Sequence, residues 1–173
     1  MKLVTFDPGK VSSYAVFDTS EPWAIQAGEV DLAGVGRFLR PCPRHIGRII
    51  EGADQVLVEE VGSMTKQGVS SMFTFGLAVG ALLNAIACHG YPLEMVKPQP
   101  WKAASRLGGL KDIEAKRAAC RYASELWPMQ ADLFRHSTKH GRAEAALMAR
   151  WYFLKGPGKD VELADGSPMR MPS

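Results

Sequence analysis

The sequence predicts an α/β fold in which a mixed sheet is flanked by helices. Three strand-like segments follow one another at the start of the chain, and helical and strand-like segments then alternate. This order is typical of a sheet that combines antiparallel and parallel strands and carries helices on its faces. The 173 residues fit one compact domain better than two, and the 46% of apolar residues suffice for a core without disulfides.

The first three strands are expected within the first 32 residues. Residues 1–9 (MKLVTFDPG) form an apolar run that ends at Asp7 and a Pro-Gly turn. Residues 12–18 and 23–32 are two further strand-like segments, with residues 19–22 as the turn between them. We expect these three strands to form a meander.

The remaining elements alternate between helix and strand. Residues 55–62 are predicted to be a buried parallel strand, because Val56, Leu57 and Val58 form a continuous apolar run. Helices are expected at residues 44–53, 67–88, 112–126 and 142–153, and a fifth strand at residues 91–98. Residues 156–173 contain three prolines and no periodicity, so the chain divides into a domain at 1–155 and a flexible tail at 156–173.

Composition argues against several classes of protein. The three cysteines lie far apart without a CxxC pair, which indicates neither a zinc ribbon nor a disulfide framework and suits a reducing cytoplasm. Residue 1 leads directly into a strand-like segment, so no signal peptide is expected. The longest apolar stretch, near residues 76–88, is interpreted as too short and too glycine-rich to span a membrane. A cytoplasmic protein without a membrane partner is therefore expected.

Basic residues are concentrated in one third of the chain. The net charge is +3, but residues 1–96 carry 7 basic and 10 acidic side chains, whereas residues 97–150 carry 11 basic and 5 acidic ones. Such an excess indicates an anionic partner, although solvated helices can look similar.

Acidic side chains stand at the ends of two predicted strands. Asp7 ends the first strand, and Glu59, with Glu60 beside it, ends the fourth. Ligands collect at strand ends in α/β sheets, and two neighbouring carboxylates repel each other unless a cation lies between them. Mg²⁺ prefers such oxygen ligands. The pattern indicates a metal site, with two solvated strand-end acids as the alternative.

The last helix carries a third acid. Glu144 follows His140 by four residues, so both share a helix face, and alanines on either side of Glu144 are small enough to pack closely on a sheet. A carboxylate on such a face is unusual; the alternative is an exposed Glu144 near a helix start. His136 and His140 lack a third ligand, so a zinc site is not expected.

Taken in order, these motifs resemble the RuvC branch of the RNase H-like superfamily. They are FDPG, VLVEEVG and HGRAEAALMA, while KQGVSSMFTFGLAVG and VKPQPWKAA resemble the phage-type members most. FDPG alone is weak, because actin-like ATPases share it, but the ordered set runs from Met1 to about Trp151. The resemblance implies an RNase H-like, mixed five-stranded sheet flanked by α-helices.

The resemblance also implies a function and a site. It implies a homodimeric, metal-dependent endonuclease that resolves Holliday junctions in branched DNA by paired symmetric nicks, in the bacterial host if the gene is phage-encoded. Two Mg²⁺ or Mn²⁺ ions would be bound in each site. Asp7, Glu59 and Glu144 fall on acidic catalytic and metal-binding positions, and His140 falls in or beside a fourth position where many relatives have aspartate.

Further residues are expected to contact DNA. Lys102 follows the PQP segment, which we interpret as a turn, and Met64 could insert between bases as a wedge. For Lys66, Gln67 and Lys102, the alternative is that they are solvated surface side chains. The predicted contacts to the DNA backbone are Lys66, Gln67, Lys102, Arg106, Lys116 and Arg117.

The helix expected at residues 67–88 carries a pair of phenylalanines and a pair of glycines. Phe73 and Phe75 are expected in the core, and Gly76 and Gly80 leave a groove where another helix could pack. Packing within the chain and a dimer contact are both open.

Other functions compete with junction resolution. A sugar-kinase-like nucleotide binder would need a second glycine loop and about twice this length. Lys139 and His140, in place of an expected acid, leave an inactive structure-specific DNA-binding protein as an alternative. A general phage nuclease for flaps or forks is a further alternative that the sequence does not distinguish.

Overall fold

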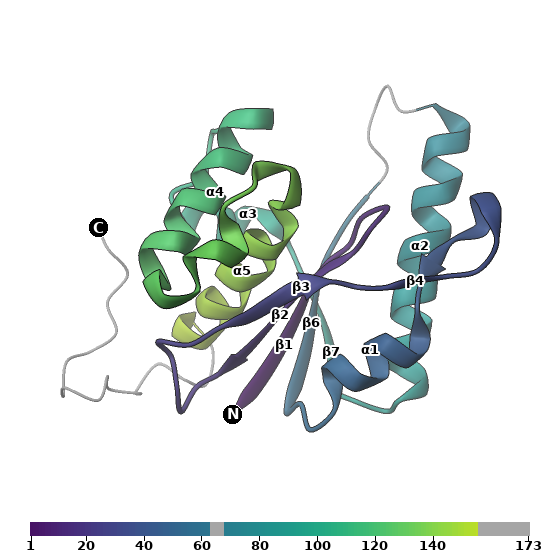
Figure 1. Cartoon of the computed structure of the whole chain (residues 1–173), viewed down its shortest axis with the longest axis horizontal. Coiled ribbons are helices and arrows are strands. Elements are labelled where there is room, and N and C mark those ends of the chain that lie inside the picture. The colour runs from purple at the N-terminus through teal and green to yellow at the C-terminus, as the bar shows by residue number, and fades with distance from the viewer. Residues whose placement is uncertain (63–67, 156–173) are drawn as a thin grey trace.

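Five strands form a mixed sheet at the centre of the molecule (Figure 1). The computed structural model describes residues 1–62 and 68–155, and the strand order is β3-β2-β1-β6-β7. The first three strands pair antiparallel, whereas β6 and β7 run parallel to β1, which confirms the predicted mixed five-stranded sheet. The strands are β1 (Lys2–Asp7), β2 (Ser13–Asp18), β3 (Gln26–Glu29), β6 (Gln55–Glu59) and β7 (Leu93–Val96).

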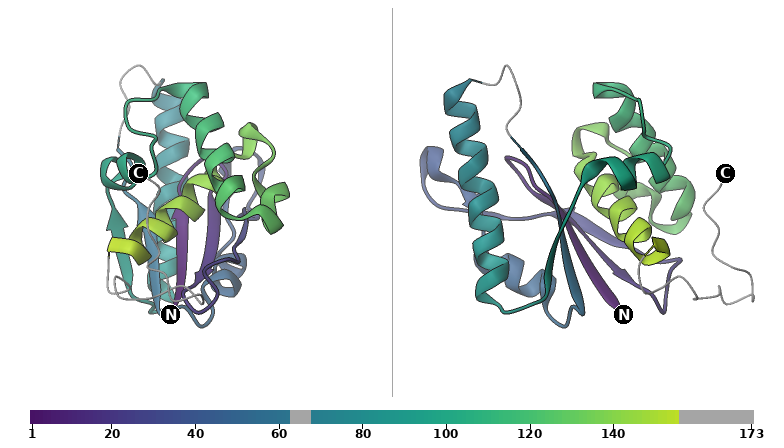
Figure 2. Two further views of the ribbon diagram at one scale, coloured as in Figure 1. Left: turned by 90° about the vertical axis from the view of Figure 1, so that its left-hand side faces the viewer. Right: turned by 180° about the vertical axis from the view of Figure 1, so that it is seen from behind.

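Helices cover both faces of this sheet (Figures 1 and 2). One face carries α1 (Pro43–Ile50) and α2 (Val69–Cys88), and the other carries α3 (Pro98–Ala104), α4 (Asp112–Leu126) and α5 (Gly141–Lys155). Side chains of a strand alternate between the faces, so Val4 and Phe6 of β1 join the core beneath α1 and α2, while Leu3 joins the opposite core.

Helix α5 lies directly on the central strands. Its alanines at positions 143, 145, 146 and 149 are all fully buried, and such small side chains let a helix axis approach a sheet closely. The hydroxyl of Thr5, on β1, donates a 2.8 Å hydrogen bond to the carbonyl oxygen of Ala145. The same strand face therefore contacts α5 at Thr5 and, two residues further, at Asp7.

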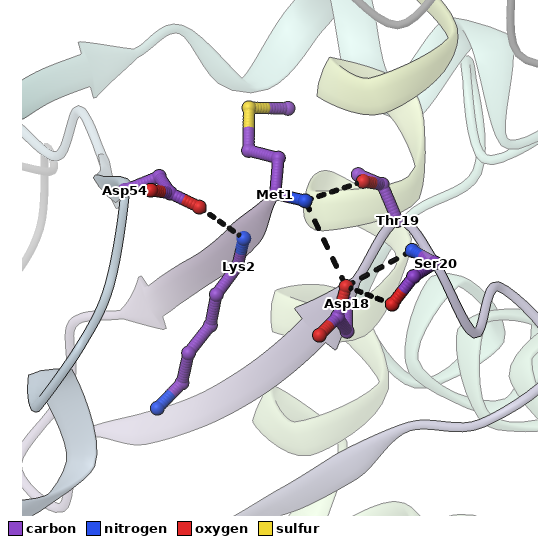
Figure 3. A network of polar contacts seen from close by, with 6 residues as sticks. All are labelled: Met1, Lys2, Asp18, Thr19, Ser20 and Asp54. Atoms are coloured by element: carbon purple, nitrogen blue, oxygen red, sulfur yellow. Dashed lines mark hydrogen bonds and ion pairs between the residues drawn. The ribbon is translucent and has the colours of Figure 1, made fainter.

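A polar network holds the opposite end of β1 in register (Figure 3). The Met1 amino group lies 3.7 Å from the carboxylate of Asp18, the last residue of β2, and donates to Thr19 Oγ1 at 2.8 Å in the turn that follows. The backbone N–H of Lys2 donates to Asp54 Oδ2 at 2.7 Å, just before β6. These contacts join the start of β1 to both neighbouring strands, and register decides which side chains face α5.

Two predicted elements were wrong in detail. Residues 23–32 are not one strand: β3 pairs with β2 only as far as Glu29, where β2 begins, and β4 (Leu32–Ala33) pairs instead with β5 (Arg40–Pro41). The PQP segment is not a turn but the first turn of α3, because proline at the first helical position loses no hydrogen bond.

Short helices occupy segments for which no element was predicted. They are the 3-10 helices η1 (Gly36–Phe38), η2 (Pro128–Phe134) and η3 (Ser137–Lys139). The predicted helices are present, with ends shifted by up to three residues. The predicted tail at residues 156–173 lies outside the described residues.

Helix α2 is more exposed than expected. Phe73, predicted to be a core residue, is 62% exposed, and a Cβ atom added at Gly76 or Gly80 would meet nothing within 4 Å. The helix has 20 residues, and an 18-residue window has a mean hydropathy of 1.8 with 22% of it buried. By length and composition it could cross a membrane, so the argument that the apolar stretch is too short was wrong. One such helix is weak evidence for a membrane span.

Replacing Thr5 with valine should test the contact between β1 and α5. Thr5→Val keeps the side-chain shape but removes the hydroxyl, so we expect the free energy of unfolding to fall by about 0.5–1.5 kcal/mol. Thr74→Val is the matched control, because Thr74 donates to the Ser70 carbonyl from the exposed surface of α2. Urea unfolding measures both; equal losses would show that the Thr5 hydroxyl does not stabilise the α5 contact.

Candidate active site

Three acidic side chains from three separate elements meet at one end of the sheet. Asp7 is the last residue of β1 and Glu59 the last of β6. The two strands are parallel with Phe6 opposite Val58. The next residue of each strand is the acid, so the two acids lie side by side and point to the same face of the sheet. Glu144, in the first turn of α5, approaches them from the helix that covers this face.

The geometry of these carboxylates suits a hard divalent cation. One ligand oxygen from each of Asp7, Glu59 and Glu144 lies within 4.8 Å of the other two. Opposite ligands of a Mg²⁺ ion stand about 4 Å apart, because each Mg–O distance is about 2.0–2.1 Å. The donor set is entirely carboxylate oxygen, which favours magnesium or manganese over metals that select thiolates.

Electrostatics reinforce this interpretation. Burial raises the pKa of Asp7 well above its usual value, and the neighbouring charges of Glu144 and Glu59 raise it further. Burial also raises the pKa values of Glu59 and Glu144, although Lys102 opposes both shifts. Three wholly or partly buried carboxylates with raised pKa values are the kind of environment that a bound cation stabilises.

The close approach of α5 depends on a glycine at its first position. A Cβ atom at Gly141 would lie 2.6 Å from Asp7 Oδ2 and 2.5 Å from Ser13 Oγ. Any other residue would push the helix away from β1 or displace the Asp7 carboxylate. Gly141 therefore sets the distance at which Glu144 reaches the two strand-end acids.

Helix α3 supplies two contacts to the site. Lys102 Nζ lies 3.3 Å from Glu59 Oε1 and 4.0 Å from Glu144 Oε2. The indole N–H of Trp101 donates to the same Glu59 oxygen at 3.2 Å. Lys102 was predicted as a DNA contact, and the structure places its ammonium group against the carboxylates themselves.

His140 lies beside this cluster. It immediately precedes α5, and its carbonyl oxygen accepts a 3.0 Å hydrogen bond from the Glu144 N–H. Its Nδ1 is 3.0 Å from the carbonyl oxygen of Ser137. Burial lowers the pKa of His140, as does the charge of Lys116, which favours a neutral ring at physiological pH. His140 lines a cleft together with the three carboxylates but is outside the group of three that could share one metal ion.

The acids open into a cleft of about 790 Å³ whose rim is basic. Of the predicted DNA contacts, Lys102 and Lys116 line the cleft, whereas Arg106 and Arg117 are exposed outside its lining. Lys10, Lys139 and Phe75 also line it. The predicted contacts Lys66 and Gln67 and the predicted wedge Met64 lie outside the described residues.

Sequence reasoning missed two residues that shape the site. Trp101 was noted only as part of a motif, although a buried tryptophan requires an acceptor for its N–H. Glu29, the last residue of β3, lies 3.5 Å from Lys139 Nζ and 3.4 Å from Arg142 Nη2, on either side of His140. Its position at a strand end is the signal that could have identified it, as for Asp7.

Removing the Asp7 charge should stabilise the metal-free protein. A carboxyl whose pKa is raised on folding holds a proton that the unfolded chain has released, so its contribution to stability falls as pH rises above the unfolded value, near 3.8. In chelator at neutral pH, Asp7→Asn should melt about 2–4 °C above the wild type, which corresponds to about 1 kcal/mol for this size. The difference in melting temperature between the two proteins should disappear as pH falls towards 4.

With Mn²⁺, the wild type should melt at a higher temperature than Asp7→Asn. Mn²⁺ should raise the melting temperature of the wild type and leave Asp7→Asn nearly unchanged, because the variant lacks a metal ligand. Differential scanning fluorimetry, with and without chelator across pH 4–8, measures both effects. An equal Mn²⁺ shift in the two proteins would exclude Asp7 from the metal site.

Comparison with known proteins gives two kinds of similarity. No family model matches the sequence. The chloroplastic Holliday junction resolvase MOC1 of Chlamydomonas reinhardtii is 31% identical to this chain over 84 residues. That match covers 49% of this chain but 9% of the length of MOC1, so the chain corresponds to a small part of that relative.

Solved structures match over a much larger share of the chain. T. thermophilus RuvC in complex with a Holliday junction substrate aligns with 90% of this chain and 96% of its own, with a TM-score of 0.59 and 18% identity. A second Thermus thermophilus RuvC structure aligns with 88% of this chain and 95% of its own, with a TM-score of 0.54 and 20% identity. The chain therefore has the fold of RuvC, an RNase H-like mixed sheet of five strands between two layers of helices.

Proposed function

We propose that this protein is a divalent-metal-dependent endonuclease that cuts branched DNA and resolves Holliday junctions by paired nicks. The observation that carries the proposal is the convergence of Asp7, Glu59 and Glu144 at one end of a RuvC fold, beside Lys102. The similar RuvC structure contains a Holliday junction substrate, and the similar MOC1 is a Holliday junction resolvase.

The residues of the site have separate roles in this proposal. Asp7, on the central strand, would hold the metal together with Glu59 and Glu144, which approach it from β6 and α5. Divalent metal bound by these carboxylates would supply an activated water and stabilisation of the charge that develops on the attacking and leaving oxygens. The ammonium group of Lys102 lies close enough to pair with a phosphate oxygen when DNA brings one to the carboxylates.

The basic rim of the cleft supplies sequence-independent affinity for DNA. Lys10, Lys116 and Lys139 stand around the acids at its lining. Ammonium groups in such positions neutralise backbone phosphates and fix the register of a nucleic acid without reading its bases. The rim thus offsets the repulsion between phosphate and the acidic site floor.

His140 bears on the choice of metal ion. With a neutral ring, an Nδ1–H that donates to the Ser137 carbonyl leaves Nε2 as the acceptor atom. Metal-bound histidines usually make such a hydrogen bond with the other nitrogen. In this proposal His140 is a fourth ligand or orients the attacking water, and an imidazole favours Mn²⁺ over Mg²⁺.

The exposed face of α2 suggests how two copies assemble. Val69 and Phe73 are 86% and 62% exposed, and a groove of about 540 Å³ runs over Gly76 and Gly80, bordered by Arg40. A second copy is the occupant that fits best, because a four-way junction offers two symmetric strands and a two-fold dimer matches them. A homodimer through this face is therefore part of the proposal.

Cleavage of synthetic DNAs should test the function. With Mn²⁺ or Mg²⁺, the wild type should cut a four-way junction at two symmetric positions and cut linear duplex far more slowly. Asp7→Asn, Glu59→Gln and Glu144→Gln should each reduce the cleavage rate at least about 100-fold while junction affinity holds or rises, because each loses a metal ligand and a charge near phosphate. His140→Ala should also lose most activity, chiefly with Mn²⁺.

Gel assays with flap, fork, duplex and junction substrates measure these rates, and band shifts in Ca²⁺ measure binding. Equal cleavage of flaps and junctions would indicate a general branched-DNA nuclease. Binding of the junction without cleavage under either metal would indicate an inactive DNA-binding protein.

Charge on the α2 face should prevent dimer formation. Phe73→Asp should raise the dimer dissociation constant at least about 10-fold, equal to about 1.4 kcal/mol, because it buries a carboxylate in an apolar contact. Ile113→Asp is the matched control: Ile113 is 63% exposed, but on α4 at the other side of the sheet. Sedimentation velocity without DNA measures both.

A wild type that is monomeric at micromolar concentration, with and without a junction, would contradict the dimer. Co-flotation of the wild type with neutral lipid vesicles, lost in Phe73→Asp, would instead assign the α2 face to a membrane.

A further inference from the structure

We propose that Trp101 is a positioning residue of the metal site: it holds one oxygen of Glu59 through its indole N–H and so presents the other oxygen to the metal. This inference deepens the proposed function and rests on it. It assigns a role to a buried side chain of α3 that touches neither DNA nor the reacting phosphate.

The position of Trp101 beneath the site supports this role. Its side chain is 1% exposed, and its Nε1–H donates to Glu59 Oε1 at 3.2 Å. Lys102 Nζ reaches the same oxygen at 3.3 Å. Both donors engage Oε1, so a cation that binds Glu59 without displacing them must use Oε2. A carboxylate held at one oxygen loses rotational freedom, which lowers the entropic cost of binding the ion.

The indole ring also constrains Lys102. The ammonium group lies 5.0 Å from the centre of the Trp101 ring, within the range of a cation–π contact. One buried ring therefore orients a metal ligand by its edge and a lysine by its face. Both partners are adjacent to the position where the three carboxylates converge.

Tryptophan meets two requirements that few side chains meet together. The space under Glu59 is apolar and buried, so it needs a large ring, and the carboxylate needs a neutral donor. A phenylalanine would fill most of the space but lacks the N–H. A lysine or arginine would add a full positive charge and compete with the metal ion for the same oxygens.

The chain contains a matched control for this hypothesis. Trp127 is also 1% exposed, and its indole N–H also donates a 3.2 Å hydrogen bond, but to the Pro22 carbonyl, away from the acids. Trp101→Phe and Trp127→Phe therefore remove the same group from equally buried positions. A merely structural role for Trp101 would make the two variants alike.

Calorimetric titration of the full chain with Mn²⁺, without DNA, is the primary test. Trp101→Phe should weaken Mn²⁺ binding about 10-fold, as loss of an outer contact to a metal ligand commonly does, and Trp127→Phe should leave it unchanged. On the junction, Trp101→Phe should need about 10-fold more Mn²⁺ for half-maximal cleavage and approach the wild-type rate at saturation. In a Glu59→Gln background, Trp101→Phe should have no further effect on Mn²⁺ affinity, because the two act through one contact.

A measurement on the wild type keeps the proposal testable if Trp101→Phe fails to fold. In a ¹⁵N spectrum, the indole N–H resonance of Trp101 should shift on titration with Mg²⁺, while that of Trp127 stays in place. Unchanged Mn²⁺ affinity in folded Trp101→Phe, or a Trp101 resonance that ignores saturating Mg²⁺, would overturn the proposal. A wild type that binds Mn²⁺ but cuts no branched DNA would overturn the proposed function instead and leave the positioning role standing.

Discussion

The burial and mutual repulsion of three neighbouring carboxylates are the constraint on which the rest of this structure depends. Burial raises the pKa values of Asp7, Glu59 and Glu144, and the charge of Glu144 raises those of Asp7 and Glu59 further. Neighbouring groups stabilise the ionised carboxylates: Lys102 pairs with Glu59 and lies near Glu144, and the N–H of Trp101 donates to Glu59. A cation among the acids would relieve the same repulsion, so metal binding is expected to stabilise the folded protein.

Close contact between α5 and β1 makes that arrangement possible. The alanines on the sheet side of α5 are small, Gly141 leaves room for the Asp7 carboxylate, and the Thr5 hydroxyl ties the helix to the strand. Each feature acts on the same variable, the distance between helix and sheet. That distance determines whether Glu144 can share an ion with the two strand-end acids. In the proposed function, these packing residues would therefore affect catalysis without touching the substrate.

The two faces of the sheet differ in what they expose. Under α3, α4 and α5 the core opens into a cleft where acids are surrounded by lysines, which suits a phosphate backbone. On the other side, α2 leaves Val69 and Phe73 in solvent above a glycine groove. In the proposed function, catalysis at the cleft and dimer formation through α2 would lie on opposite sides of one sheet, so two copies could approach a branched substrate without blocking either site.

The sequence by itself determined the sheet and the three acids. Apolar runs that stop at Asp7 and Glu59 reflect the local rule that buried strands end where charge begins, and an alanine-rich face around Glu144 indicates close packing. Only the tertiary structure decided what depends on contacts between distant segments. Trp101 and Lys102 meet Glu59 across more than 40 positions of chain, residues 23–32 lose their partner where β2 begins, and Phe73 is exposed although its helical pattern predicts burial. Local pattern specifies which face of a strand or helix is apolar, but what covers that face is set by how the elements fold against one another.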